Sequence, residues 1–174
     1  MPFAGLGRPA LNFVTGGMME RKLTGLFLGA GASYNVSMPL VWELTAELKN
    51  WLTVEKLKRF NAGWKQEGGG HPDEVIEDFI SVLARGDLHY ESILGYLEVQ
   101  SRRQRSLSSD YHSLYAWLVQ MIYYTLYFKH VKGADFIVRN LELYRGVVHL
   151  YEENTPLWVF SLNHDSIIEM IAKK

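Results

Sequence analysis

The sequence predicts an α/β fold in which a partial, Rossmann-like parallel sheet carries a large all-helical insert between its first two recognisable strands. One apolar stretch, Leu23–Leu28, runs directly into a loop with two glycines, and a second one, residues 157–162 ("LWVFSL"), runs into an Asn-His-Asp segment. The residues between the two stretches repeat apolar side chains at helical spacing and contain no convincing third strand.

The first predicted elements are a strand and a long helix. Leu23–Leu28 is a short apolar run of the kind found in buried parallel strands. From Leu40 to Leu57 the apolar residues follow a helical period, and Pro39 suits the first turn of this helix, where a missing N–H is not needed. The segment Gly63–Pro72 contains three consecutive glycines and predicts a break.

More helices are predicted before the chain returns to a strand, over Pro72–Arg85, Leu88–Gln100, Asp110–His130 and Asp135–Glu153. The second strand, "LWVFSL", follows, and Asp165 can cap a last helix, "SIIEMIAKK". Two strands cannot bury both faces of a doubly wound sheet, so we expect the chain to be a fragment whose remaining strands follow residue 174.

The expected organisation is one domain preceded by a short extension. Residues 1–20 form the extension, residues 21–174 form the first part of a nucleotide-binding domain, and 39–155 are its helical insert. Residues 1–17 lack the pattern of a secretion signal, and whether they are native stays open because Met18 and Met19 offer alternative starts.

Composition narrows the class of protein. An apolar content of 48% indicates a folded protein, and a net charge of −1 gives no electrostatic basis for direct nucleic-acid binding. The richest apolar stretch, Leu114–Phe128, is shorter than the roughly 20 residues that cross a membrane, so we expect no membrane contact. The absence of cysteine excludes thiolate metal sites in this chain and is compatible with the cytoplasm, where we expect the protein.

The glycine loop after the first strand is suited to a diphosphate. Its pattern is G-A-G-A-S, formed by Gly29, Ala30, Gly31, Ala32 and Ser33. A glycine-rich turn between strand and helix exposes backbone N–H groups, and side chains at the glycines would block a ligand's approach. The common dinucleotide fingerprint has a third glycine where this chain has Tyr34.

The segment after the second strand supplies polar groups at the same predicted edge of the sheet. Asn163 can bond a ribose hydroxyl or orient a water, and Asp165 can bond ribose or cap the following helix. Asn and Asp are also common turn and cap residues, so a structural role for both stays open.

Together, "LFLGAGASYNVSMPLVWEL" and "WVFSLNHDSIIEMIA" resemble the sirtuin-like domain, and "YESILGYLE" is similar to a helix of its prokaryotic antiphage-defence NAD hydrolase branch. The resemblance covers only the first part of that domain. It implies NAD as the substrate, with the diphosphate at Gly29–Ser33, a contribution to binding from Pro39, and Asn163 and Asp165 as catalytic residues beside the nicotinamide ribose.

The resemblance also implies a histidine that acts as general base downstream of the Asn-His-Asp segment. His164 lies inside the Asn-His-Asp segment, and none of the remaining five histidines follows it. No catalytic histidine is therefore assigned. We therefore expect this chain to be inactive alone.

Three functions are compatible with the resemblance. Hydrolysis of NAD to nicotinamide and ADP-ribose, as antiviral defence by NAD depletion, is favoured by the long helical insert and needs no metal. A sensor or assembly module that binds NAD or ADP-ribose without catalysis is the first alternative, and an NAD-dependent protein deacylase is the second. The predicted helix from Tyr111 to Phe128 carries more aromatic surface than one core face needs, which predicts a homo-oligomer. A second defence protein is a further candidate partner.

Overall fold

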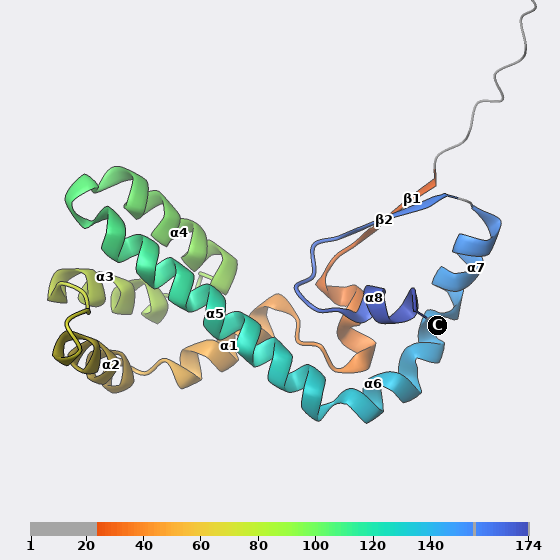
Figure 1. The fold of residues 1–174 in the computed structure, drawn as a ribbon, viewed down its shortest axis with the longest axis horizontal. Helices are drawn as coiled ribbons and strands as arrows, with labels where there is room; N and C mark the ends of the chain where they lie inside the picture. Colours follow the sequence, from red (N-terminus) through yellow and green to blue (C-terminus); the bar gives the residue numbers. More distant parts are fainter. Residues whose placement is uncertain (1–23, 155, 174) are drawn as a thin grey trace, which may run out of the picture.

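The structure is a computed structural model that describes residues 24–154 and 156–173, and it is a mixed α/β fold made mostly of helices (Figure 1). The elements, with η for a 3₁₀ helix, are β1 (Thr24–Leu28), η1 (Ala30–Val36), α1 (Val41–Trp51), α2 (Val54–Gln66), α3 (Asp73–Ala84), α4 (Tyr90–Arg103), η2 (Arg105–Leu107), α5 (Ser108–Lys132), α6 (Ala134–Asn140), η3 (Leu141–Tyr144), α7 (Arg145–Glu153), β2 (Leu157–Ser161) and α8 (Ile167–Ile171). The predicted extension, residues 1–20, and the start of the first predicted strand at Leu23 lie outside the described residues.

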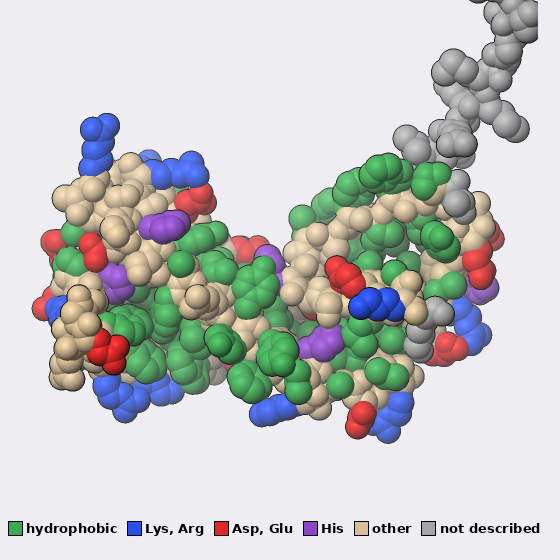
Figure 2. Space-filling view, viewed as in Figure 1, with side chains coloured by type: hydrophobic (Ala, Val, Ile, Leu, Met, Phe, Trp, Pro, Cys, Tyr) green, Lys and Arg blue, Asp and Glu red, His purple; other side chains and the backbone are tan. Residues whose placement is uncertain are grey.

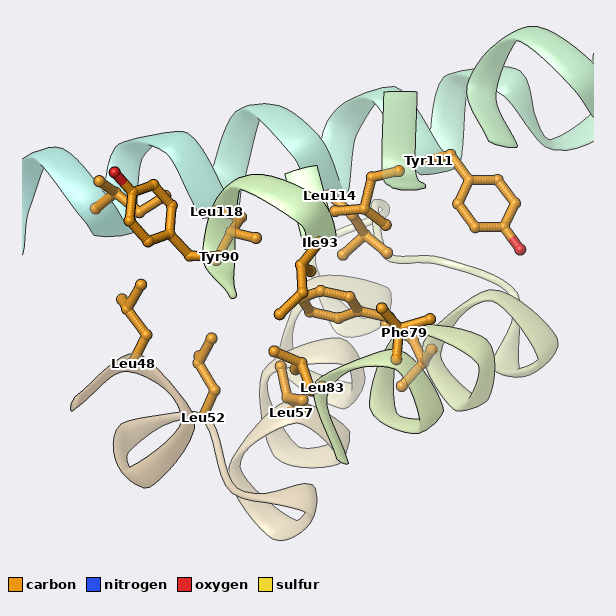
Figure 3. Close-up of a cluster of buried hydrophobic side chains, with 14 of the residues drawn as sticks. Leu48, Leu52, Leu57, Phe79, Leu83, Tyr90, Ile93, Tyr111, Leu114 and Leu118 are labelled. Atoms are coloured by element: carbon orange, nitrogen blue, oxygen red, sulfur yellow. The ribbon is translucent and has the colours of Figure 1, made fainter. Parts of the chain in front are cut away.

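Helices α1 to α4 and most of α5, from Tyr111 to Leu126, enclose the larger of two hydrophobic cores (Figure 3). Phe79 of α3 is fully buried at its centre, among residues such as Leu57 of α2, Ile93 of α4 and Leu114 of α5. The apolar residues of α3 recur three and four positions apart, which places them on one helical face. This core therefore follows from the helical periodicity of the sequence.

A second, smaller core lies beside the strands. It contains Val36 and Met38 from the segment after β1, Ile137 of α6, and Ile167 and Ile171 of α8. Helix α5 runs from the first core to this region, so a single helix joins the insert to the sheet end of the molecule (Figure 1).

Among the described residues the sheet has two strands, β1 and β2, which are parallel as predicted. Both faces remain largely exposed, and the exposed side chains include Phe27, Trp158 and Phe160. The hydrophobic side chains along the strands are visible at the upper right of Figure 2.

The predicted helix Leu40–Leu57 is wrong as one element, because the chain breaks at Leu52 and Thr53 between α1 and α2. The Thr53 side chain caps α2 by accepting a hydrogen bond from the Lys56 N–H at 3.4 Å. The predicted role of Pro39 also changes: α1 begins at Val41, and Pro39 lies two residues before it.

The predicted break at Gly63–Pro72 begins later than expected, because α2 continues through Gly63 to Gln66. Aromatic packing explains the extension. Trp64 contacts Phe60 and Trp117, with ring centroids 6.2 and 5.4 Å away, and this tertiary contact outweighs the low helix propensity of one glycine.

The predicted helix Asp135–Glu153 divides into α6, η3 and α7. In the middle piece, Leu141 is buried in the second core and the Tyr144 hydroxyl donates to the Ala32 carbonyl oxygen at 2.6 Å. The 3₁₀ helix thus occurs where the burial of Leu141 and the hydrogen bond of Tyr144 hold the chain against residues remote in sequence.

A carboxylate links three helices of the insert. The Tyr96 hydroxyl of α4 donates to both oxygens of Asp78 on α3 at 2.8 Å, and the Tyr111 hydroxyl of α5 donates to Asp78 Oδ2 at 2.9 Å. Burial, with a further contribution from Asp78, raises the pKa of both tyrosines, and burial raises the pKa of Tyr90 to about 12.

These tyrosines predict loss of stability at high pH. Their pKa values are higher in the folded state than the ordinary value near 10, so their stabilisation is complete below about pH 10 and is lost as the pH rises towards 12. Tyr111→Phe should lower the free energy of unfolding at pH 8 by about 1–3 kcal/mol. Between pH 8 and pH 11 the free energy of unfolding should fall less in this variant than in the wild type. Urea unfolding followed by circular dichroism measures both effects. Tyr127→Phe, at an exposed position, is the control and should change neither quantity. An unchanged pH dependence in Tyr111→Phe would refute this assignment.

Candidate functional site

The two segments that the sequence analysis singled out lie next to each other. Strands β1 and β2 pair in parallel with Leu28 opposite Ser161, and the Leu162 N–H donates to the Leu28 carbonyl oxygen at 3.0 Å. The glycine loop and the Asn-His-Asp segment therefore leave the sheet at the same edge, the carboxyl ends of the strands (Figure 1). This is where open α/β folds bind ligands.

A hydrogen bond joins the two segments directly. The Asn163 side-chain amide donates from Nδ2 to Ser33 Oγ at 2.9 Å, and Ser33 is fully buried. The other end of the Asn163 amide, Oδ1, is buried and has no hydrogen-bond partner among the described residues. An unpaired buried acceptor destabilises the folded state, because its hydrogen bond to water is lost and no protein group replaces it.

Asp165 lies one residue before Ser166, the N-cap of α8, and its side chain bonds the start of that helix. Its Oδ1 accepts a hydrogen bond from the Ile167 N–H at 3.1 Å, at the first residue of α8. The same carboxylate contributes, after burial, to a raised pKa of Tyr144. Asp165 thus supports the local structure, and its predicted catalytic role remains a prediction.

A cavity of about 210 Å³ opens beside these segments. Five of the predicted site residues line it: Gly29, Ala30, Pro39, Asn163 and Asp165. The other three, Gly31, Ala32 and Ser33, do not, although Ser33 positions Asn163 through the hydrogen bond described above. The volume is below the roughly 300–1,000 Å³ of sites that enclose a whole small molecule. The cavity formed by the described residues is therefore too small to enclose a whole dinucleotide.

The opposite wall of the cavity comes from the helical insert. Tyr90 and Glu91 from the start of α4 and Leu126 of α5 line it, and His164 completes the Asn-His-Asp side, with its ring against Tyr123 at 5.7 Å. None of these residues was predicted from the sequence to belong to the site. The only signal for them was the stretch "YESILGYLE", which begins with the two α4 residues of the wall.

The protein itself does not require glycine at Gly29 or Gly31. Gly29 has φ −104° and ψ −177°, which other residues adopt freely, and Gly31 does not have a positive φ. A Cβ atom built at either position meets no protein atom within 4 Å. The open space beside the loop is what a ligand that approaches the backbone closely would use.

The charges of the cavity are acidic. Glu91 and Asp165 line it, and no Lys or Arg is among the described residues that do so. A bound diphosphate would therefore depend on backbone N–H groups of the glycine loop, whereas the carboxylates favour positive charge within the cavity.

The loop differs from the predicted strand-turn-helix in one respect. The residues after Gly29 form the 3₁₀ helix η1, and the first α-helix begins only at Val41. The buried side chains of Ser33 and Val36 hold η1 against the rest of the fold. The N–H groups near the cavity thus belong to a short 3₁₀ helix, whose dipole is weaker than that of a long α-helix.

Comparisons with protein-family models, curated proteins and solved structures find no match to this chain. Within residues 24–154 and 156–173, no three His, Asp or Glu side chains are grouped so as to hold a metal ion. No helix in the described part of the chain has the length and apolar character needed to cross a membrane.

Proposed function

We propose that this chain forms part of an NAD-binding site and that the natural full-length protein hydrolyses NAD to nicotinamide and ADP-ribose. The observation that carries the proposal is the orphaned Oδ1 of Asn163, held at the cavity by Ser33. A ribose hydroxyl or a water bound there would donate the hydrogen bond that this oxygen lacks. The proposal also assigns β1 and β2 to a Rossmann-like sheet, in which ligands bind at this edge.

The proposed binding mode follows from the shape and charge of the site. The nicotinamide ribose would occupy the cavity, and the diphosphate would lie against the open side of Gly29 and Gly31. Breaking the bond between C1′ and the nicotinamide nitrogen develops positive charge on the sugar. Glu91 and Asp165 are the acidic side chains that would stabilise this charge, and Asn163 would orient the ribose or the attacking water.

The long insert supports hydrolysis rather than transfer to a protein. Tyr90, Glu91 and Leu126 close the cavity from the side opposite the sheet. A wall at this position shields a reacting sugar and limits the size of the acceptor, which favours water.

Gly29→Ala tests NAD binding. The added Cβ meets no protein atom, so we expect the free energy of unfolding to change by no more than about 1 kcal/mol. NAD affinity, measured by isothermal titration calorimetry on the full-length protein, should fall about tenfold or more, because the methyl group occupies the space of the diphosphate. Gly63→Ala is the matched control: it is a glycine of α2, also open around its Cβ, and α2 contributes nothing to the cavity. Unchanged affinity in Gly29→Ala would contradict the proposed binding mode.

Product analysis of the same protein separates the candidate functions. Nicotinamide and ADP-ribose formed from NAD alone would support hydrolysis. NAD binding without any products would instead support a sensor or assembly module. Release of nicotinamide only in the presence of an acyl-lysine peptide would support a deacylase.

A further inference from the structure

A second cavity, of about 560 Å³, lies between the α2–α3 loop and α5 and shares no lining residue with the first. Its lining includes Trp64 at the end of α2, Glu67 and His71 of the loop, and Asp110, Trp117 and Gln120 of α5. None of these residues takes part in the proposed NAD site.

The loop that forms one side of this cavity is held in a defined conformation. The buried side chain of Asn61 bonds the backbone of His71 twice, donating to its carbonyl oxygen at 3.0 Å and accepting from its N–H at 2.8 Å. Gly70 has φ +86°, and a Cβ atom there would lie 2.9 Å from the backbone nitrogen of Lys65. Only glycine fits this turn, so the loop presents its side chains to the cavity in a fixed arrangement.

The aromatic walls of the cavity are equally ordered. The rings of Trp64 and Trp117 are 5.4 Å apart with an interplanar angle of 81°, so they form adjacent walls nearly at right angles. The His71 ring packs against Trp64 at 5.7 Å, and its Nδ1 lies 3.0 Å from Asp110 Oδ1. The Asp110 carboxylate is thereby fixed between the loop and α5.

The charged side chains around this second cavity indicate which kind of ligand it can bind. Glu67 and Asp110 line the cavity, whereas no Lys or Arg in the described part of the chain does. The nearby Lys65 ammonium is 2.7 Å from Asp73. Such a site disfavours anions. The indole walls and the carboxylates both favour binding of a cation with an apolar shell, because indole rings attract cations and carboxylates complement their charge.

We propose that this cavity, which we call the tryptophan pocket, binds a small organic cation with an alkylated ammonium group. The proposal depends on the two indole walls, on the Asp110 carboxylate that His71 holds in place and on the second carboxylate of Glu67, and it is independent of the NAD site.

Choline and its neutral isostere 3,3-dimethyl-1-butanol are the probes, titrated into the full-length protein. We expect choline to shift the indole N–H signals of Trp64 and Trp117 in NMR spectra, and those of the other three tryptophans to stay in place. Choline should bind about tenfold more tightly than the neutral alcohol. Equal binding of both, or no shift of the two pocket signals by choline, would overturn the proposal.

Substitutions of opposite sign at Gln120, an exposed residue of α5, give the second test. Gln120→Lys should weaken choline binding about tenfold, and Gln120→Glu should strengthen it. Val131→Lys adds the same charge at an exposed position of the same helix outside the pocket, and should leave the affinity unchanged. Circular dichroism confirms folding of each variant. Shifts of affinity in the same direction for both Gln120 variants would refute the assigned charge preference.

Discussion

Asn163→Ala should lower NAD turnover by the full-length protein about 100-fold to 1,000-fold while the fold stays intact. The amide is anchored at Nδ2 by Ser33, and its free Oδ1 is the group that we propose orients the ribose or water. The substitution removes one hydrogen bond but also an unpaired buried acceptor. The free energy of unfolding should therefore change by about 1 kcal/mol or less.

Ser33→Ala is the matched control for this variant. It breaks the same hydrogen bond but keeps the Asn163 amide at the cavity. We expect a decrease in turnover of about tenfold or less, because the amide loses its anchor and not its oxygen. Initial rates of nicotinamide release measure both variants. Wild-type turnover in Asn163→Ala would remove the central residue of the proposal, and an equal loss in Ser33→Ala would indicate that only the contact between the two segments matters.

Phe79→Ala should lower the free energy of unfolding by about 3–5 kcal/mol. The ring is fully buried at the centre of the larger core, among helices α2 to α5, so its removal leaves a cavity that the surrounding helices cannot close (Figure 3). A loss of this size is a large share of the roughly 5–15 kcal/mol that stabilises a typical domain.

Phe128→Ala provides the comparison at an exposed position, where the residue is 54% accessible. The free energy of unfolding, measured with urea, should change by no more than about 0.5 kcal/mol in this variant. Phe79→Ala should also weaken NAD binding, because Tyr90 and Leu126, which line the first cavity, belong to the same core. Unfolding of Phe79→Ala at the wild-type urea concentration would contradict the described core.

Local pattern was sufficient for most of the secondary structure. Helix α3 was predicted within one residue at each end, because Asp73 and Glu74 mark its first turn and its apolar residues keep one period throughout. The two strands were recognised for a similar reason, since each is a short apolar run bounded by residues that favour turns. Periodicity, caps and breakers act between near neighbours, so the sequence carries them directly.

Contacts between remote residues decided the rest. The extension of α2 past Gly63 depends on Trp117, and the 3₁₀ helix at Tyr144 accompanies a hydrogen bond to Ala32. The same holds for the wall of the first cavity formed by Glu91, and for the pairing of His71 with Asp110.

The sequence by itself therefore determined both strands and most of the helices, and which polar residues stand at the ends of the strands. Only the tertiary structure decided that Asn163 meets Ser33, that one amide oxygen stays unpaired, and that the insert closes the cavity. The physical reason is that helical spacing is a property of consecutive residues, whereas a cavity is formed by residues that packing brings together from distant parts of the chain.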